Sequence, residues 1–178
     1  IFSDCDFFAG CENIISVLLN STDMEKYYKI TFFYRYSKQY EKGLLARLHR
    51  RNNLRRMYLF IVNRSTLPNS MRQNFLFRVI WRFFAILSYP LFFILNLLII
   101  LLSLYKVPKK EFLYVNNGGY PASKNALAAV CLGHFLGFNK IILSCNNTAT
   151  KKSKYFILNF VQSFFDKIIN DFCSIVVV

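Results

Sequence analysis

Three stretches of the chain, residues 4–13, 116–121 and 145–150, contain the residue types best suited to bind a ligand. Glycines in the first two let backbone N–H groups approach a ligand closely, and a helix N-terminus that follows such a turn attracts phosphate or carboxylate. The asparagine carboxamides offer donors and acceptors that suit sugar hydroxyl groups. We therefore predict binding of a phosphorylated or sugar-bearing ligand. A purely structural interpretation stays open, because Asn and Gly also form turns readily.

The other reactive side chains give no comparable pattern. His134 falls inside an expected helix and His49 in a basic surface run, so both are better explained as structural residues. The chain contains no Walker loop, no G-x-S-x-G or H-E-x-x-H motif and no dinucleotide fingerprint. Its five cysteines are scattered and include no C-x-x-C pair, which argues against a zinc site or a disulfide framework. These residues assign no metal, no cofactor and no catalytic group.

The elements that must position the three stretches alternate along the chain. Short β-branched and aromatic runs predict strands at residues 1–2, 29–34, 57–62, 111–115, 140–144 and 172–178. Amphipathic spacing predicts helices at residues 11–20, 37–49, 122–136 and 154–170. Ser37 is expected to cap the second of these helices and Gly137 to stop the third. This alternation is typical of an α/β fold with a parallel sheet and helices on both faces. Right-handed crossovers would bring the three stretches to the carboxyl edge of that sheet, where ligands bind.

A long hydrophobic helix interrupts the alternation, and we expect it over residues 79–105. Residues 83–104 contain no charge and are long enough to cross a bilayer as a helix. Pro90 and Asn96 weaken the spanning interpretation, and basic residues flank both ends of the segment. A helix lying in one leaflet explains this symmetry better than a span does. A buried helix packed on the sheet is the remaining alternative.

Composition favours an anionic membrane surface as a partner. The chain has 178 residues, suited to a single domain spanning 1–178, and a net charge of +14 with 54% hydrophobic residues. Nucleic acid is disfavoured as a partner, because its binding proteins are usually richer in exposed polar residues. The first and last residues read like interrupted strands, so we expect the chain to be a fragment of a longer protein.

Several motifs resemble a known family. Residues 7–13 (FFAGCEN), 34–37 (YRYS) and 116–121 (NNGGYP), with the later Asn146-Asn147, are similar to the N-terminal half of bacterial GT-B glycosyltransferases. The nearest group is the retaining family-four type, which builds cell-surface polysaccharides. The similarity covers nearly the whole chain, and the NNGGYP run is its most specific part.

The resemblance implies a Rossmann-like, acceptor-side domain that works at the cytoplasmic face of the cell membrane. Its acceptor would be a lipid-linked sugar or a polysaccharide, and the nucleotide-sugar co-substrate would be bound mainly by a second domain that has no counterpart here. The implied loop facing the donor phosphates is Phe8, Ala9, Gly10, Cys11 and Glu12. The implied acceptor-binding residues are Asn116, Asn117, Gly118, Gly119, Tyr120, Asn146 and Asn147. Hexosyl transfer would need the second domain, so the chain would be inactive alone.

A non-enzymatic alternative also fits the sequence. In it, residues 83–104 anchor the chain to a membrane and the α/β part is a scaffold.

Overall fold

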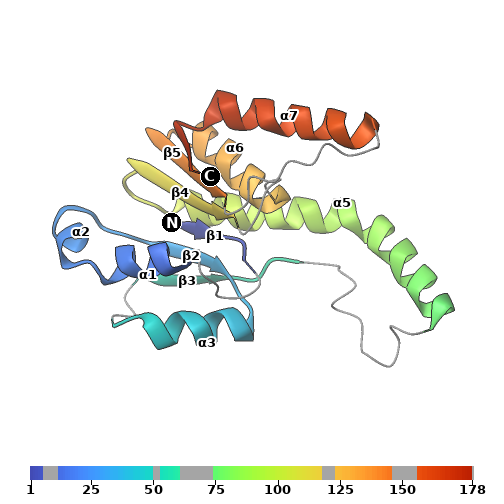
Figure 1. Ribbon diagram of the computed structural model, residues 1–178, viewed down its shortest axis with the longest axis horizontal. Coiled ribbons are helices and arrows are strands. Elements are labelled where there is room, and N and C mark those ends of the chain that lie inside the picture. Colours follow the sequence, from blue (N-terminus) through green and yellow to red (C-terminus); the bar gives the residue numbers. More distant parts are fainter. Residues whose placement is uncertain (6–11, 50–52, 61–73, 118–122, 146–155, 178) are drawn as a thin grey trace.

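The computed structural model describes residues 1–5, 12–49, 53–60, 74–117, 123–145 and 156–177. It contains a parallel six-stranded sheet in the order β3-β2-β1-β4-β5-β6 (Figure 1). The strands are β1 (Phe2–Ser3), β2 (Phe32–Arg35), β3 (Leu54–Met57), β4 (Phe112–Asn117), β5 (Lys140–Cys145) and β6 (Ile175–Val177). The predicted α/β class with a parallel sheet is therefore confirmed.

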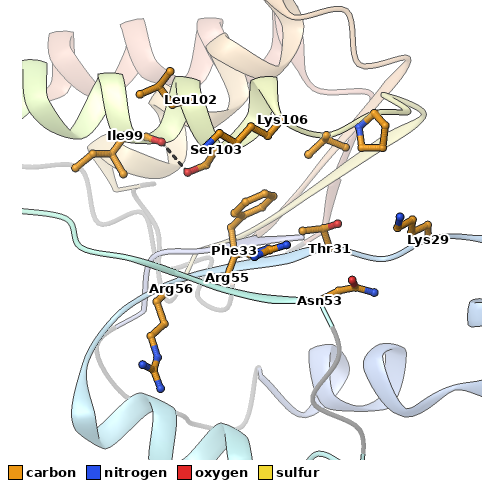
Figure 2. A pocket seen from close by; sticks show the side chains of 12 residues that line it. Lys29, Thr31, Phe33, Asn53, Arg55, Arg56, Ile99, Leu102, Ser103 and Lys106 are labelled. Carbon is orange, nitrogen blue, oxygen red and sulfur yellow. Dashed lines mark hydrogen bonds between the residues drawn. The ribbon is translucent and has the colours of Figure 1, made fainter.

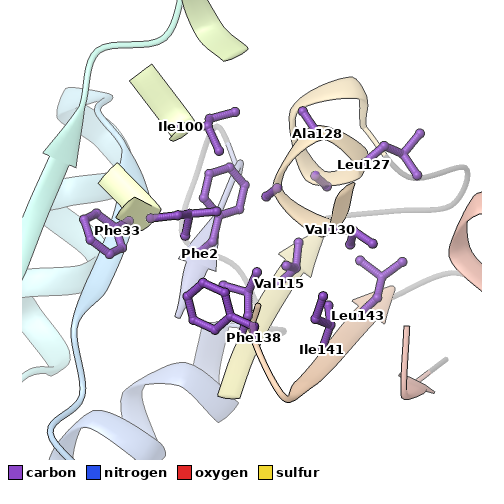
Figure 3. Close-up of a cluster of buried hydrophobic side chains, with 14 of the residues drawn as sticks. Phe2, Phe33, Ile100, Val115, Leu127, Ala128, Val130, Phe138, Ile141 and Leu143 are labelled. Atoms are coloured by element: carbon purple, nitrogen blue, oxygen red, sulfur yellow. The ribbon is translucent and has the colours of Figure 1, made fainter. Parts of the chain in front are cut away.

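Helices cover both faces of this sheet. They are α1 (Glu12–Asn20), α2 (Thr22–Tyr27), α3 (Lys38–Arg47), α5 (Phe75–Tyr105), α6 (Lys124–Phe135) and α7 (Phe156–Phe172). Phe2 of β1 and Val115 of β4 face α5 and α6, and the hydrophobic cluster of Figure 3 forms there. Phe32 and Tyr34 of β2 point to the opposite face and pack with residues of α1 and α3. Side chains alternate between faces along a strand, so one short strand contributes to both cores.

The N-terminal end of α3 and the C-terminal end of α6 follow ordinary capping chemistry. The Ser37 side chain accepts a hydrogen bond from the Tyr40 backbone N–H at 3.0 Å, which confirms its predicted role as the cap of α3. After the C-terminal end of α6, Gly137 adopts a φ of 81°, a left-handed conformation that glycine reaches without strain. The predicted stop after α6 is therefore also confirmed.

Several strand boundaries differ from the sequence prediction: β2 and β6 begin three residues later than expected, at Phe32 and Ile175, and the ends of β3 and β4 also differ. The third strand was expected at 57–62, but β3 spans Leu54–Met57 and carries Arg55 and Arg56. β3 is an edge strand, where charged side chains reach solvent and apolar periodicity is a poor guide. The fourth strand was expected to end at 115, yet Asn116 and Asn117 pair with Ser144 and Cys145 in the β4–β5 ladder. The Asn-Asn pair thus ends a strand rather than forming a turn.

The helix α5 is longer than the predicted 79–105 and packs on the sheet along only part of its length. Its C-terminal half contributes Asn96, Ile100 and Leu104 to the interior at intervals of four residues. Its N-terminal half extends past the sheet (Figure 1). Within the described residues, α5 is the one helix long and apolar enough to cross a membrane, and 11% of its most apolar 18-residue window is buried. A fully buried core helix is therefore the wrong interpretation.

Asn96 explains how a polar residue fits within this apolar helix. It is 5% exposed, and its Oδ1 accepts a hydrogen bond from the Phe60 backbone N–H at 2.7 Å. Its Nδ2 donates to the Phe60 carbonyl oxygen at 2.9 Å. The carboxamide therefore pairs with both backbone groups of Phe60, as a neighbouring strand would, and it faces protein rather than lipid.

We expect Asn96→Leu to destabilise the protein by about 1–3 kcal/mol, although it makes α5 more apolar. The reason is that both Phe60 backbone groups would lose their partner in a partly buried setting. The measurement is the free energy of unfolding in urea, with Ser88→Ala as the control on the same helix. Among the described residues, the Ser88 hydroxyl bonds only to carbonyls of its own helix, so its loss should change little. A neutral or stabilising Asn96→Leu would contradict this role.

Candidate functional site

The polar stretches predicted from the sequence meet at one edge of the sheet. β1, β4 and β5 are adjacent and parallel, so residues that follow them emerge at the same carboxyl edge. The strand order also reverses its direction between β1 and β4, and ligands of open parallel sheets bind at such a switch point. The predicted common edge is confirmed for the described parts of these stretches.

A buried ion pair lies at this switch point. Asp4, directly after β1, has its Oδ1 3.0 Å from Nη1 of Arg35, the last residue of β2. Both residues are 8% exposed. The other carboxylate oxygen of Asp4 accepts hydrogen bonds from Ser123 Oγ at 2.8 Å and from Asn125 Nδ2 at 3.1 Å. Asp4 therefore joins β1, β2 and the start of α6.

Ser123 connects this ion pair to β4. Its Oγ accepts from the Ala126 backbone N–H at 3.1 Å, which makes it the N-cap of α6. Its own backbone N–H donates to Oδ1 of Asn117 at 2.9 Å. Residue 123 was expected inside the helix predicted at 122–136. That assignment is wrong, since Ser123 ends the incoming loop and uses its hydroxyl as donor and acceptor at once.

Asn116 makes the corresponding connection on the opposite face of the sheet. Its Nδ2 donates to Ser3 Oγ at 3.3 Å and lies 3.5 Å from Cys5 Sγ. The Tyr40 hydroxyl of α3 donates to the same Ser3 oxygen at 3.2 Å. Asn116 is fully buried, so its carboxamide holds β4 against β1 beneath the edge.

The structure describes only some of the implied binding residues. Asn116 and Asn117 lie at the carboxyl edge with buried side chains and internal hydrogen bonds. Glu12 is the first residue of α1. The remaining implied residues lie outside the described part of the chain: Phe8, Ala9, Gly10, Cys11, Gly118, Gly119, Tyr120, Asn146 and Asn147. Their binding roles stay predictions.

Sequence reasoning missed the ion pair and its partners. Asp4, Arg35, Ser123 and Asn125 were not chosen as site residues, although a signal existed. An acidic residue after one strand and a basic residue at the end of the next are brought together when the two strands are parallel neighbours. The pairing of β1 with β2 was needed to see it.

A second polar cluster lies between β2, β3 and α3. Glu41 Oε1 accepts from the Tyr34 hydroxyl and from Arg56 Nε, each at 2.5 Å. Burial, with the hydrogen bond to Glu41, raises the pKa of Tyr34 to about 12. Burial acts to raise the pKa of Glu41 as well, but the bonds from Tyr34 and Arg56 outweigh it and lower that pKa. The cluster is therefore a charged pair with a neutral tyrosine at neutral pH.

Exposed aromatic rings border this cluster. The rings of Tyr36 and Tyr58 lie with their centroids 5.1 Å apart, and the Arg56 guanidinium lies 5.5 Å from the Tyr36 centroid. Tyr36 follows β2 and Tyr58 follows β3, so both lie at the carboxyl edge. Sugar rings commonly pack on exposed aromatic faces of this kind.

No group of three metal-ligating side chains occurs among the residues that the structure describes. Comparison of the chain with protein-family models, curated proteins and solved structures finds no match. The functional assignment therefore depends on the geometry of the edge and on the resemblance of the motifs.

We expect Asp4→Asn to destabilise the fold by about 3–5 kcal/mol, because it removes the negative charge of the buried pair that Asp4 forms with Arg35. The double variant Asp4→Asn/Arg35→Met should recover part of that loss. Urea unfolding measures both, with the exposed Asp23→Asn as a control expected to change little. A single Asp4→Asn variant as stable as the control would contradict the role assigned to the ion pair.

Tyr34→Phe should lower the free energy of unfolding by about 1–2 kcal/mol at neutral pH, since a bond to a charged carboxylate is lost. The Glu41 pKa is lowered in the folded state, so the stability from its contacts is present above its ordinary value of 4.5 and declines as pH falls through the folded pKa. The difference between wild type and variant should therefore shrink in acid. Unfolding curves at several pH values test this; a difference independent of pH would contradict it.

Proposed function

We propose that the chain is the acceptor-side domain of a GT-B glycosyltransferase that works on a lipid-linked acceptor at the cytoplasmic face of a membrane. The strand order 3-2-1-4-5-6 is the order of Rossmann-like domains, which supports the fold part of the proposal. The motifs 7–13 and 116–121 support the family part.

The observation on which the proposal depends most is the course of α5. The helix begins at Phe75 and runs back toward the amino end of β4, antiparallel to the strands. Its N-terminal half therefore extends beyond the carboxyl edge (Figure 1), the same edge at which Asn116 and Asn117 lie. A membrane-bound helix at that position would bring a lipid-linked acceptor next to the site.

The outward face of α5 suits a position in one leaflet. Six apolar side chains on the side away from the sheet are between 46% and 69% exposed: Ile80, Leu87, Leu91, Ile94, Leu98 and Leu102. Basic residues lie at both ends of the helix: Arg78, Arg82, Lys106, Lys109 and Lys110. Removing the helix from the sheet to span a bilayer would expose Ile100 and Leu104 and break the Asn96 bonds. An interfacial helix keeps all of these contacts.

The chemistry proposed for this domain is positioning. It would hold the acceptor sugar so that one hydroxyl faces a nucleotide-sugar bound by a second domain, and the sugar would transfer to that hydroxyl as the nucleotide leaves. Orientation and stabilisation of the donor phosphates would supply most of the rate. The Asp4–Arg35 pair would act as a positioning element, since Asp4 also binds Ser123 and so fixes the start of α6 at the carboxyl edge.

A non-enzymatic membrane module is the second candidate. The exposed face of α5 favours it as much as the enzymatic proposal, because that face accounts for membrane attachment by itself. The two differ in whether the carboxyl edge recognises a sugar.

Binding to nanodiscs tests this difference. One set would contain a polyprenyl-pyrophosphate-linked monosaccharide and the other the same polyprenyl pyrophosphate without sugar. We expect the sugar-bearing discs to bind about tenfold more tightly, equivalent to about 1.4 kcal/mol. Asn146→Ala/Asn147→Ala should abolish that preference without changing attachment to lipid. Equal binding to both discs by the wild-type chain would contradict the acceptor role and leave the membrane module.

A further inference from the structure

A basic cavity lies at the amino edge of the sheet, on the side opposite the candidate site. Its volume is about 700 Å³, and it lies between β2, β3 and the C-terminal end of α5 (Figure 2). The residues before β2 and β3 form one wall, and the last turn of α5 with residues 106–108 forms the other. None of its described lining residues follows the carboxyl end of a strand, so it is separate from the candidate site.

The described lining of the cavity is basic. Lys29, Arg55 and Lys106 line it, and no acidic side chain does so among the residues that the structure describes. Arg56 also borders the cavity, but Figure 2 shows its guanidinium directed toward α3, where it pairs with Glu41. Within the described residues, Lys29, Arg55 and Lys106 form no ion pair. An anion between them would remove their mutual repulsion.

The uncharged part of the lining is suited to a phosphate with an apolar tail. Thr31, Ser103 and Asn53 supply hydroxyl and amide groups beside the cations. Phe33, Ile99 and Leu102 supply an apolar wall. Leu102 is also 57% exposed and belongs to the outward face of α5, so the cavity opens onto the surface proposed to enter the membrane.

We propose that this cavity binds the phosphate headgroup of one anionic phospholipid, whose acyl chains lie along Leu98 and Leu102. The continuity of the cavity with the apolar face of α5 favours a lipid over a soluble phosphate, because a soluble anion would leave that face without an occupant. The inference rests on the proposed interfacial position of α5. It adds a specific lipid contact that holds the C-terminal end of the helix at the level of the headgroups.

The test compares two triple variants with the same net charge. The cavity variant is Lys29→Gln/Arg55→Gln/Lys106→Gln. The control variant is Lys38→Gln/Lys42→Gln/Lys167→Gln, which removes three exposed cations away from the cavity. Affinity is measured by co-sedimentation with vesicles of phosphatidylglycerol and phosphatidylcholine, and circular dichroism checks the fold of both variants. We expect the cavity variant to bind about tenfold more weakly than the control variant.

Two further arms separate the possible outcomes. Millimolar inorganic phosphate should not displace the chain from the vesicles, and displacement would overturn the assignment to a lipid. If both triple variants lose the same amount of affinity for the vesicles, the cavity proposal is overturned, and only non-specific attraction between the basic chain and anionic lipid remains. The double variant Leu87→Gln/Leu91→Gln, on the outward face of α5, tests whether this helix lies in the membrane interface. If this double variant binds vesicles as well as wild type, the interfacial position of α5 is contradicted. If it loses vesicle binding while the two triple variants bind equally well, the cavity proposal alone is contradicted.

Discussion

The rest of the structure depends on one constraint: α5 is apolar on all sides, but the sheet can cover only one of them. Asn96, Ile100 and Leu104 use the covered side. Apolar side chains on the other side stay exposed over a helix about 45 Å long. Exposed apolar surface of this extent indicates an interaction surface. We propose anionic lipid as the partner of this surface, because basic residues lie at both ends of the helix.

The position of α5 links this surface to the candidate site. Asn96 connects the helix to the segment after β3 and lies 3.5 Å from Asn125 at the start of α6. Asn125 in turn bonds to Asp4 at the switch point. A short chain of hydrogen bonds therefore runs from α5 to the carboxyl edge. In the proposed interfacial position of α5, this connection would fix the height of the edge above the lipid surface.

Much of this arrangement could be predicted because it depends on local patterns. Strand and helix alternation, the Ser37 cap and the Gly137 stop all follow from short-range chemistry. The errors have long-range causes: the β3 boundary depends on an edge strand with Arg55 and Arg56, and the role of Asn96 depends on contact with Phe60. The Asp4–Arg35 pair needed the strand order, which no local pattern gives.

Depth-dependent quenching of tryptophan fluorescence by brominated lipids tests the position of α5 most directly. Trp81 is the single native tryptophan, so Trp81→Phe provides a background for one reporter at a time. The reporters are Leu87→Trp, Leu91→Trp, Leu98→Trp and Leu102→Trp. An interfacial helix predicts the same shallow depth at all four positions. Reporters at 91 and 98 near the bilayer centre, with those at 87 and 102 closer to the surface, would contradict it and indicate a span.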